Sequence, residues 1–440
     1  MIRQLLAWIL TLIVVLNGPA AEQSNIVVIM ADDLGYGDVR SFWQDSPAPT
    51  PHLDAMATDG MRLTDFHSSG NVCSPTRAGL LTGRYQQRAG IPGVINADPK
   101  VAAHYRGLQH SETTFAELLQ SAGYETAILG KWHLGYDKKF NPITHGFDHF
   151  RGFVSGNIDY FSHYDRMEVY DWWDGQKTIV EEGYSTHLIT HHAVQFIHDN
   201  KDRPFCLYVA HEAVHAPWQG PNDVAERGPN KVLGKKKTAK QALPEMLTEL
   251  DKSVGEIRSA LKETGIDRKT LVFFFSDNGP AGGSSGPLRG RKGSNWEGGH
   301  RVPAIACWPG IVPPGSVSDE LSISLDLMPT MLEIANVQPP KERPLDGVSL
   351  LSLLRGDPTG ASRKLFWNGK AMRDGKWKLM KGGRGDDRQA VRLYDLDKDI
   401  GEQIDLSAQY PERTRQMLAD LKSWENDVTS NSTPQPQAAE

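Results

Sequence analysis

The sequence predicts an α/β fold, in which helices flank a mostly parallel central sheet and a small antiparallel sheet plus one helix follows at the C-terminus. Unbroken runs of apolar residues are typical of strands buried on both faces, and helical segments between such runs favour a parallel sheet. Past about residue 360, short alternating strands with Gly and charged turns indicate an antiparallel sheet. The buried runs are Asn25–Met30, Tyr124–Leu129, Pro204–Ala210 and Thr270–Ser276.

The length of 440 residues allows one large domain and a small one. The net charge of −6, with Lys and Arg dispersed, shows no footprint for nucleic-acid binding. We expect a signal peptide over residues 1–21, a main catalytic domain over 22–360, an α+β subdomain over 361–428 and a disordered tail over 429–440.

The first 21 residues have the three parts of a secretory signal. Arg3 supplies the basic region, Leu5 to Leu16 the apolar region, and Gly18-Pro19-Ala20 a cleavage site of small residues. The apolar run is too short for an ordinary membrane span. We therefore expect an exported protein, periplasmic or secreted, that does not associate with a membrane once the signal is removed.

Local signals place the remaining elements. Thr114 and Glu117 form a capping box for a helix that ends at Ala122, and helices are predicted over residues 184–200, 243–261 and 411–426. Residues 303–308 indicate another strand, and residues 145–175, rich in Gly, Asp, His and aromatic residues, a long loop that lines a site. The sequence leaves open whether Cys206 and Cys307, both within apolar runs, form a disulfide.

Polar residues follow each of the four buried runs. Because a mostly parallel sheet binds ligands outside the carboxyl ends of its strands, we expect these residues to meet in one site. Acid and amide oxygens suit a hard cation such as calcium more readily than zinc. The residues are Asp32 and Asp33, Lys131 and His133, His211 and His215, and Asp277 and Asn278.

A lone cysteine, Cys73, lies at a predicted helix start. Pro75 fits the first turn of a helix, and the free N–H groups there favour negative charge beside Cys73. Arg77, one turn later, reaches the same place. Further along, the Gly-rich segment 282–293 contains three cations, one of them Lys292, and its glycines let a loop approach a ligand closely.

The pattern Cys-x-Pro-x-Arg followed by Leu-Leu-Thr-Gly-Arg, at residues 73–84, resembles the signature of the type I sulfatases. The likeness covers almost the whole chain after residue 25, although the family more often has Ser or Ala where this chain has Thr76. It implies the fold of the alkaline phosphatase superfamily. It also implies that a maturation enzyme converts Cys73 to formylglycine, whose hydrate is the nucleophile.

The same resemblance implies residue roles. Calcium would lie among Asp32, Asp33, Asp277, Asn278 and the oxidised Cys73. Arg77 would hold the formylglycine hydrate, Lys131 and Lys292 would bind sulfate oxygens, and His133 and His215 would transfer protons. For the reaction itself we expect Asp277 to act as the base.

The expected substrate is a sulfated glycan, an N-acetylgalactosamine sulfate or a related polysaccharide, with Asp159, His211 and His300 as candidates for contacts with sugar hydroxyls. Three alternatives stay open. They are a phosphomonoesterase or phosphonate hydrolase on the same fold, a non-catalytic carbohydrate-binding homologue, and an enzyme that uses the Cys73 thiol directly.

Overall fold

The computed structural model describes residues 23–229, 236–357, 360, 362–382 and 390–436. The predicted signal peptide at residues 1–21 lies outside these residues. Within them, ten strands form one sheet in the order β11-β2-β10-β9-β1-β8-β4-β5-β6-β7. Its strands are β1 (Asn25–Ala31), β2 (Met61–Leu63), β4 (Glu125–Lys131), β5 (His149–Phe153), β6 (Trp173–Asp174), β7 (Lys177–Thr178), β8 (Phe205–Ala210), β9 (Thr270–Ser276), β10 (Ala304–Cys307) and β11 (Ser316–Ser318).

The centre of the sheet is parallel, as predicted. The neighbours β9, β1, β8, β4 and β5 run in the same direction. The register aligns Met30 with Ala210, Ala210 with Gly130, and Ala31 with Ser276. The residues that follow these positions therefore leave the sheet at one edge and at one level, which is where the sequence places the site.

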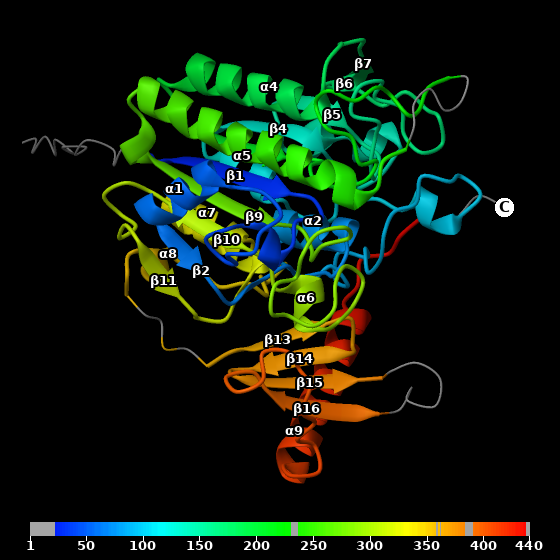
Figure 1. Cartoon of the computed structure of the whole chain (residues 1–440), viewed down its shortest axis with the longest axis vertical. Coiled ribbons are helices and arrows are strands. Elements are labelled where there is room, and N and C mark those ends of the chain that lie inside the picture. Colours follow the sequence, from blue (N-terminus) through cyan, green and yellow to red (C-terminus); the bar gives the residue numbers. More distant parts are fainter. Residues whose placement is uncertain (1–22, 230–235, 358–359, 361, 383–389, 437–440) are drawn as a thin grey trace, which may run out of the picture.

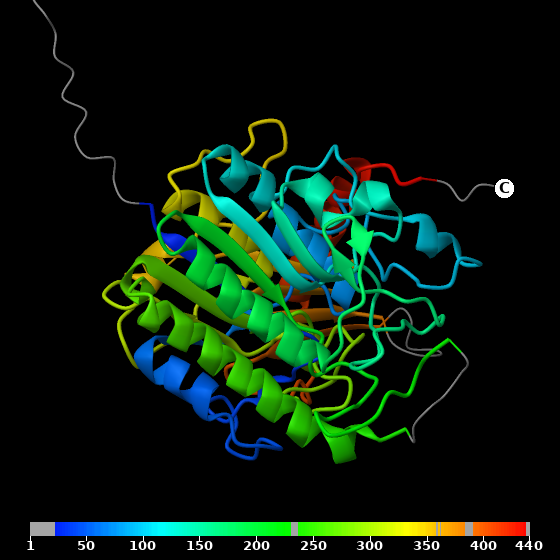
Figure 2. The ribbon, with the colours of Figure 1, turned by 90° about the horizontal axis from the view of Figure 1, so that it is seen from above.

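Helices cover both faces of the sheet, so the protein has three layers (Figure 1). Side chains alternate along a strand, and on β1 Ile26 and Val28 belong to the core beneath α2, α3 and α7, whereas Val27 and Ile29 belong to the core with α1, α4 and α5. Figure 2 shows α4 and α5 lying side by side across one face. The helices are α1 (Pro51–Asp59), α2 (Cys73–Thr82), α3 (Phe115–Ser121), α4 (Ser185–Asn200), α5 (Ala239–Glu263), α6 (Glu297–His300), α7 (Leu327–Ile334), α8 (Leu351–Leu354) and α9 (Pro411–Ser430).

The predicted start of α3 is confirmed. Thr114 accepts a hydrogen bond from the Glu117 amide, and the Glu117 side chain returns one to the Thr114 amide, which closes the capping box of α3. Among the described residues, no helix combines the length and the apolar character that crossing a membrane requires.

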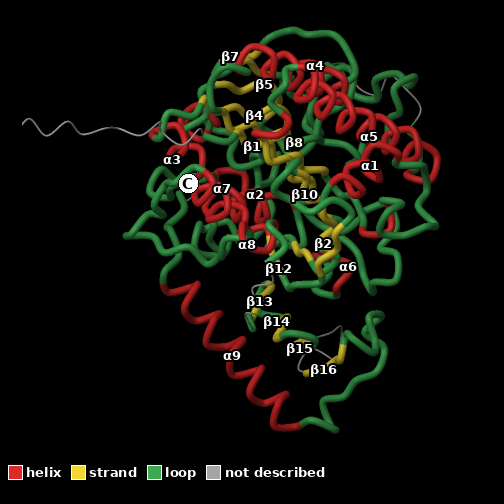
Figure 3. The backbone as a smooth tube through the Cα atoms, turned by 90° about the vertical axis from the view of Figure 1, so that its left-hand side faces the viewer, coloured by secondary structure: helices red, strands yellow, loops and turns green. Residues whose placement is uncertain are grey.

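A separate antiparallel sheet follows β12 and α8, as predicted. Its strands are β13 (Lys364–Trp367), β14 (Ala371–Asp374), β15 (Trp377–Lys381) and β16 (Val391–Asp395), in that order. The long helix α9 lies along them (Figure 3). The other small sheet pairs β3 (Phe66–His67) with β12 (Ser322–Ile323). The predicted domain boundary at residue 360 falls between α8 and β13.

The strand predicted over residues 303–308 is present as β10 and runs antiparallel to β9. Two details differ from the sequence prediction. His149–Phe153 is strand β5 within the segment expected to be a loop. The predicted disordered tail begins too early, because α9 continues to Ser430 and the buried Thr433 donates from its amide to the Arg88 carbonyl. Cys206 and Cys307 are both free.

A buried network of charges joins the C-terminal sheet to α6. Lys378, on β15, donates from Nζ to Oε1 of Glu297 at 2.7 Å, and Arg373 on β14 donates to Oε2 of Glu297 at 2.8 Å. All three side chains are almost fully buried. The C-terminal sheet therefore contacts α6, close to the loop that carries Lys292.

Candidate active site

Acidic and amide side chains converge where β1 and β9 end. The Asp33 amide donates to Oδ1 of Asp277 at 3.3 Å, and Nδ2 of Asn278 donates to Oδ1 of Asp33 at 2.7 Å. Asp32 lies beside them, and all four side chains are buried. The structure thus brings together the four residues that the sequence predicts as metal ligands.

Cys73 is the first residue of α2, preceded by Val72 in an extended conformation. Its Sγ atom lies 3.5 Å from Oδ1 of Asp32 and 3.4 Å from Nζ of Lys292. Every residue of α2 is buried, so the helix holds Cys73 rigidly against the acids.

Arg77 lies one turn along α2 and points to the same group. Its Nη2 donates to Oδ2 of Asp277 at 3.0 Å and its Nη1 to the Lys131 carbonyl at 2.9 Å. Because the side chain is buried and held at both ends, it ties α2 to the ends of β4 and β9.

Two lysines place positive charge on the acids. Nζ of Lys131, at the end of β4, contacts Oδ2 of Asp32, and Nζ of Lys292 lies 2.6 Å from Oδ1 of Asp33. Lys131 is fully buried, whereas the Lys292 side chain remains partly exposed to the cavity above.

His133 and His215 line that cavity, which has a volume of about 130 Å³. Nε2 of His133 lies 3.0 Å from the Ile95 carbonyl, which can only accept, so Nε2 carries the proton and Nδ1 is left without a partner among the described residues. In the same way Nδ1 of His215 donates to the Ala216 carbonyl at 2.6 Å, and its Nε2 lies 3.6 Å from Oδ2 of Asp33.

Burial and charge shift the pKa values in this group. Burial and the negative charge of Asp32 raise the pKa of the Cys73 thiol to about 12, which keeps the thiol neutral and opposes its direct use as a thiolate. Burial and Asp32 also raise the pKa of Asp277 to about 7. For Asp32 itself, Lys131 and other cations outweigh burial and hold its pKa well below the usual range.

The donor set fits a divalent cation. Oδ1 of Asn278 is buried and has no hydrogen-bond partner among the described residues, and the candidate ligand atoms of Asp32, Asp33, Cys73 and His215 lie within 4.8 Å of one another. An unpartnered buried oxygen beside three carboxylates is the arrangement that a hard cation satisfies.

The side chains of Asp159, His211 and His300, which were expected to contact sugar hydroxyls, are all buried and bonded within the protein. Asp159 accepts from the backbone amides of residues 161, 162, 226 and 227. Nε2 of His211 contacts Oγ of Ser253 at 2.9 Å. Nε2 of His300 lies 3.1 Å from Nζ of Lys378, inside the network that joins the C-terminal sheet to α6.

Other residues reach the cavity that sequence reasoning missed. No motif marks them individually, because they lie on irregular loops whose path depends on tertiary packing; Asn157 and Arg166 fall in the segment 145–175 that was expected to line a site. They are Asn96, Tyr136, Asn157 and Arg166.

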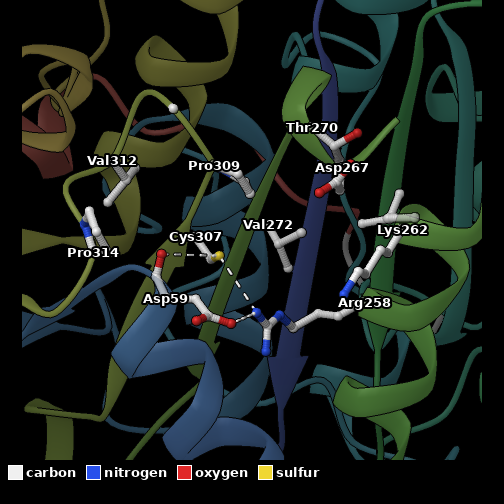
Figure 4. Close-up of a pocket in the computed structure, with 12 residues that line it drawn as sticks. Asp59, Arg258, Lys262, Asp267, Thr270, Val272, Cys307, Pro309, Val312 and Pro314 are labelled. Atoms are coloured by element: carbon white, nitrogen blue, oxygen red, sulfur yellow. Dashed lines mark hydrogen bonds and ion pairs between the residues drawn. The ribbon is translucent and has the colours of Figure 1, made fainter. Parts of the chain in front are cut away.

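A further cavity of about 340 Å³ lies elsewhere (Figure 4). Arg258 reaches Asp59 and Cys307 there. Cys307 pairs with Val272, near the start of β9, whereas Asp277 follows the end of that strand. This cavity is therefore at the opposite end of the sheet and takes no part in the site at Cys73.

The fold and the site together define a hydrolase of the alkaline phosphatase-like type. Residues 24–337 match the Sulfatase family model, and residues 292–427 match the model for the C-terminal part of N-sulphoglucosamine sulphohydrolase. The chain belongs to the sulfatase family and is a sulfuric ester hydrolase. The family implies a formylglycine and a metal site.

The chain is similar to known proteins along most of its length. The chain is 38% identical to N-acetylgalactosamine-6-sulfatase of Rattus norvegicus over 80% of this chain and 70% of that protein. It is 35% identical to human arylsulfatase A over 91% and 87% of the two chains. A crystal structure of Ps i-CgsB in complex with k-i-k-neocarrahexaose superposes with a TM-score of 0.81 and 27% identity, covering 94% of each chain.

Proposed function

We propose that this enzyme removes sulfate from a sulfated glycan, using a formylglycine at position 73 and one calcium ion. One observation carries the proposal: the Cys73 side chain lies between Asp32 and Lys292, at the floor of a cavity that two histidines line. A nucleophile at position 73 therefore lies next to the carboxylate of Asp32 and the ammonium group of Lys292.

Calcium would be held by the oxygens of Asp32, Asp33, Asp277 and Asn278, together with an oxygen at position 73. When bound, it supplies positive charge that favours an ionised hydroxyl at position 73 and offsets charge on the sulfuryl group. Arg77, already bonded to Asp277, orients the side chain at position 73, and Asp277 accepts its proton.

The hydrated aldehyde supplies one hydroxyl as the nucleophile and a second whose deprotonation allows sulfate to leave. Lys131 and Lys292 bind the sulfuryl oxygens, since fixed charges aimed at developing charge are usually the largest catalytic contribution. Both ammonium groups already lie against carboxylates of the site.

The two histidines move protons at different atoms. His215, when both of its ring nitrogens are protonated, delivers the Nε2 proton to the oxygen of the leaving alcohol, because its Nδ1 proton is committed to the Ala216 carbonyl. His133 receives a proton at Nδ1, its unpartnered nitrogen, from the second hydroxyl at position 73.

A glycan substrate is supported by the nature of the relatives. One is named for a sulfated N-acetylgalactosamine, and one solved structure holds a neocarrahexaose. The cavity carries amide and phenol groups from Asn96, Asn157 and Tyr136, which are suited to sugar hydroxyls. The predicted signal peptide supports export to a compartment in which the enzyme would encounter such polysaccharides. The proposal also requires a partner, the maturation enzyme that oxidises Cys73.

The test is a desulfation screen against defined sulfated mono- and disaccharides, with an aryl sulfate and an aryl phosphate alongside. We expect inorganic sulfate from at least one sulfated saccharide. Release of phosphate with no release of sulfate would support the phosphatase alternative, and no hydrolysis of any ester by correctly matured protein would contradict the proposal.

A further inference from the structure

A second cavity, of about 380 Å³, adjoins the active-site cavity; we call it the basic cavity. The two cavities share Arg166 as a lining residue, and Ala216, at the border, directly follows His215. The basic cavity therefore lies beside the cavity in which a sulfate would sit against Cys73. Its lining residues are Arg166, Glu168, Ala216, Pro217, Trp218, Glu226, Arg227, Lys236 and Lys237.

Side-chain amides anchor two guanidinium groups at this border. Nη1 of Arg227 donates to Oδ1 of Asn157 at 3.3 Å, and Nη2 of Arg166 donates to Oδ1 of Asn96. Both amides line the active-site cavity. Among the described residues, neither guanidinium group donates another hydrogen bond. Each therefore has further N–H groups that can bind a ligand.

The segment that carries Arg227 is held in place from below. The buried carboxylate of Asp159 accepts from the Glu226 amide at 2.6 Å and from the Arg227 amide at 3.0 Å. Asp159 thus positions Arg227 instead of touching sugar itself.

The charges in the basic cavity favour an anion. Lys237 is already paired, 2.6 Å from Asp223, but Arg166, Arg227 and the exposed Lys236 also line the cavity. Of the two acids that line the cavity, Glu226 is buried and Glu168 is exposed. In a chain with a net charge of −6, this local excess of cations marks a place for an acidic group.

We propose that the basic cavity is a subsite for a second acidic group, a carboxylate or a sulfate, on the sugar next to the one that loses its sulfate. Arg166 and Arg227 bind that group, since a guanidinium matches the paired oxygens of both anions. The half-buried Trp218 offers its ring to the face of the same sugar. This proposal rests on the proposed function and narrows its substrate to polyanionic glycans.

The experiment compares three disaccharides that carry the same scissile sulfate. The neighbouring sugar is neutral, a uronic acid, or itself sulfated. For the wild type we expect kcat/KM to be about tenfold higher or more for at least one acidic disaccharide than for the neutral one. The carboxylate and sulfate arms identify which anion the cavity prefers.

Arg227→Gln should lower this preference about tenfold, mainly through KM, and should weaken its dependence on salt. If Arg227→Gln does not fold, Arg166→Gln, a substitution at an exposed position, tests the same preference for acidic disaccharides. The matched control is Arg203→Gln, which removes a surface guanidinium beside the start of β8, at the other end of the sheet; its preference should equal that of the wild type.

The outcomes separate the two proposals. Hydrolysis of the saccharides with an equal rate for neutral and acidic neighbours, or with a preference that both variants retain, overturns the subsite and leaves the sulfatase proposal standing. Failure of the wild type on all saccharides and on an aryl sulfate overturns both.

Discussion

Nζ of Lys292 lies 3.4 Å from Sγ of Cys73, although 219 residues separate them in the chain. The Lys292 amide also donates to the Pro280 carbonyl, and the Gly293 amide donates to the Asn71 carbonyl, so the Gly-rich loop is tied to the residues just before α2. The contact places a fixed positive charge beside the atom that becomes the nucleophile.

Replacing Lys292 by Ala should lower kcat by about 10²–10³, or about 2–4 kcal/mol, the size of a lost oxyanion contact. Steady-state kinetics on a small sulfate ester measures the effect, and the neighbouring exposed Arg291→Ala is the control. An effect confined to KM would assign Lys292 to ground-state binding.

Removal of calcium with a chelator should abolish activity and lower Tm by about 3–5 °C, because the acid cluster loses the ion that binds only the folded state. Thermal unfolding with and without added calcium measures this directly. Asn278→Ala, which removes the unpartnered buried oxygen, should show a smaller calcium-dependent shift, and the exposed Asn426→Ala should respond like the wild type. An unchanged Tm in the chelated wild type would argue against the metal site.

The buried ion pairs of Glu297 with Lys378 and Arg373 should contribute to the free energy of unfolding. Lys378→Met leaves the buried Glu297 without its nearest cation and should cost about 3–5 kcal/mol in the free energy of unfolding. Lys364→Met is the matched control: Lys364 contacts Asp420 at the same 2.7 Å, but on the surface, so its loss should cost less than about 1 kcal/mol. Equal losses in urea unfolding would contradict the assignment.

Stability should also depend on pH through Glu402. Burial, opposed by Lys378 and reinforced by Glu297, raises the pKa of this carboxyl from 4.5 to about 7. The folded state therefore binds a proton that the unfolded state has released between these values, and the stability from the neutral carboxyl is lost as pH rises from 4.5 to about 7.

Glu402→Gln keeps the neutral form at all pH values. It should match the wild type near pH 4.5 and exceed its free energy of unfolding by on the order of 1–3 kcal/mol above pH 7. Urea titrations across this range measure the difference, with the exposed Glu412→Gln as control. A constant offset at every pH would show that Glu402 does not titrate in this way.

Local patterns were sufficient for the central elements. The apolar run Thr270–Ser276 matches β9 residue for residue, and the Thr114 capping box starts α3. Short edge strands were harder, because two-residue strands such as β6 and β7 have no periodicity and form only where β5 offers a partner.

The site residues, too, could be predicted only where a local pattern determines their position. Asp32, Asp277 and Lys131 could be placed because a parallel sheet brings the ends of its strands together. The burial of Asp159 and His211 could not be predicted from the sequence, because burial of a polar side chain depends on tertiary packing. Arg166 lies in the segment 145–175 that was expected to line a site, but nothing local distinguishes it from its neighbours, and the loop of Arg227 carries no local signal at all.

Cys73→Ser tests the need for the second hydroxyl at position 73. A serine sulfate ester has no neighbouring hydroxyl to expel it, so we expect at most a single turnover with sulfate retained on the protein. Full multiple turnover by this variant would contradict the mechanism.

The most direct measurement is the mass of the peptide that contains residue 73, taken from protein that is hydrolysing a sulfate ester. We predict a mass about 18 Da below that of the cysteine peptide, in proportion to the specific activity of the sample. A fully active sample in which residue 73 is an unmodified cysteine would contradict the account.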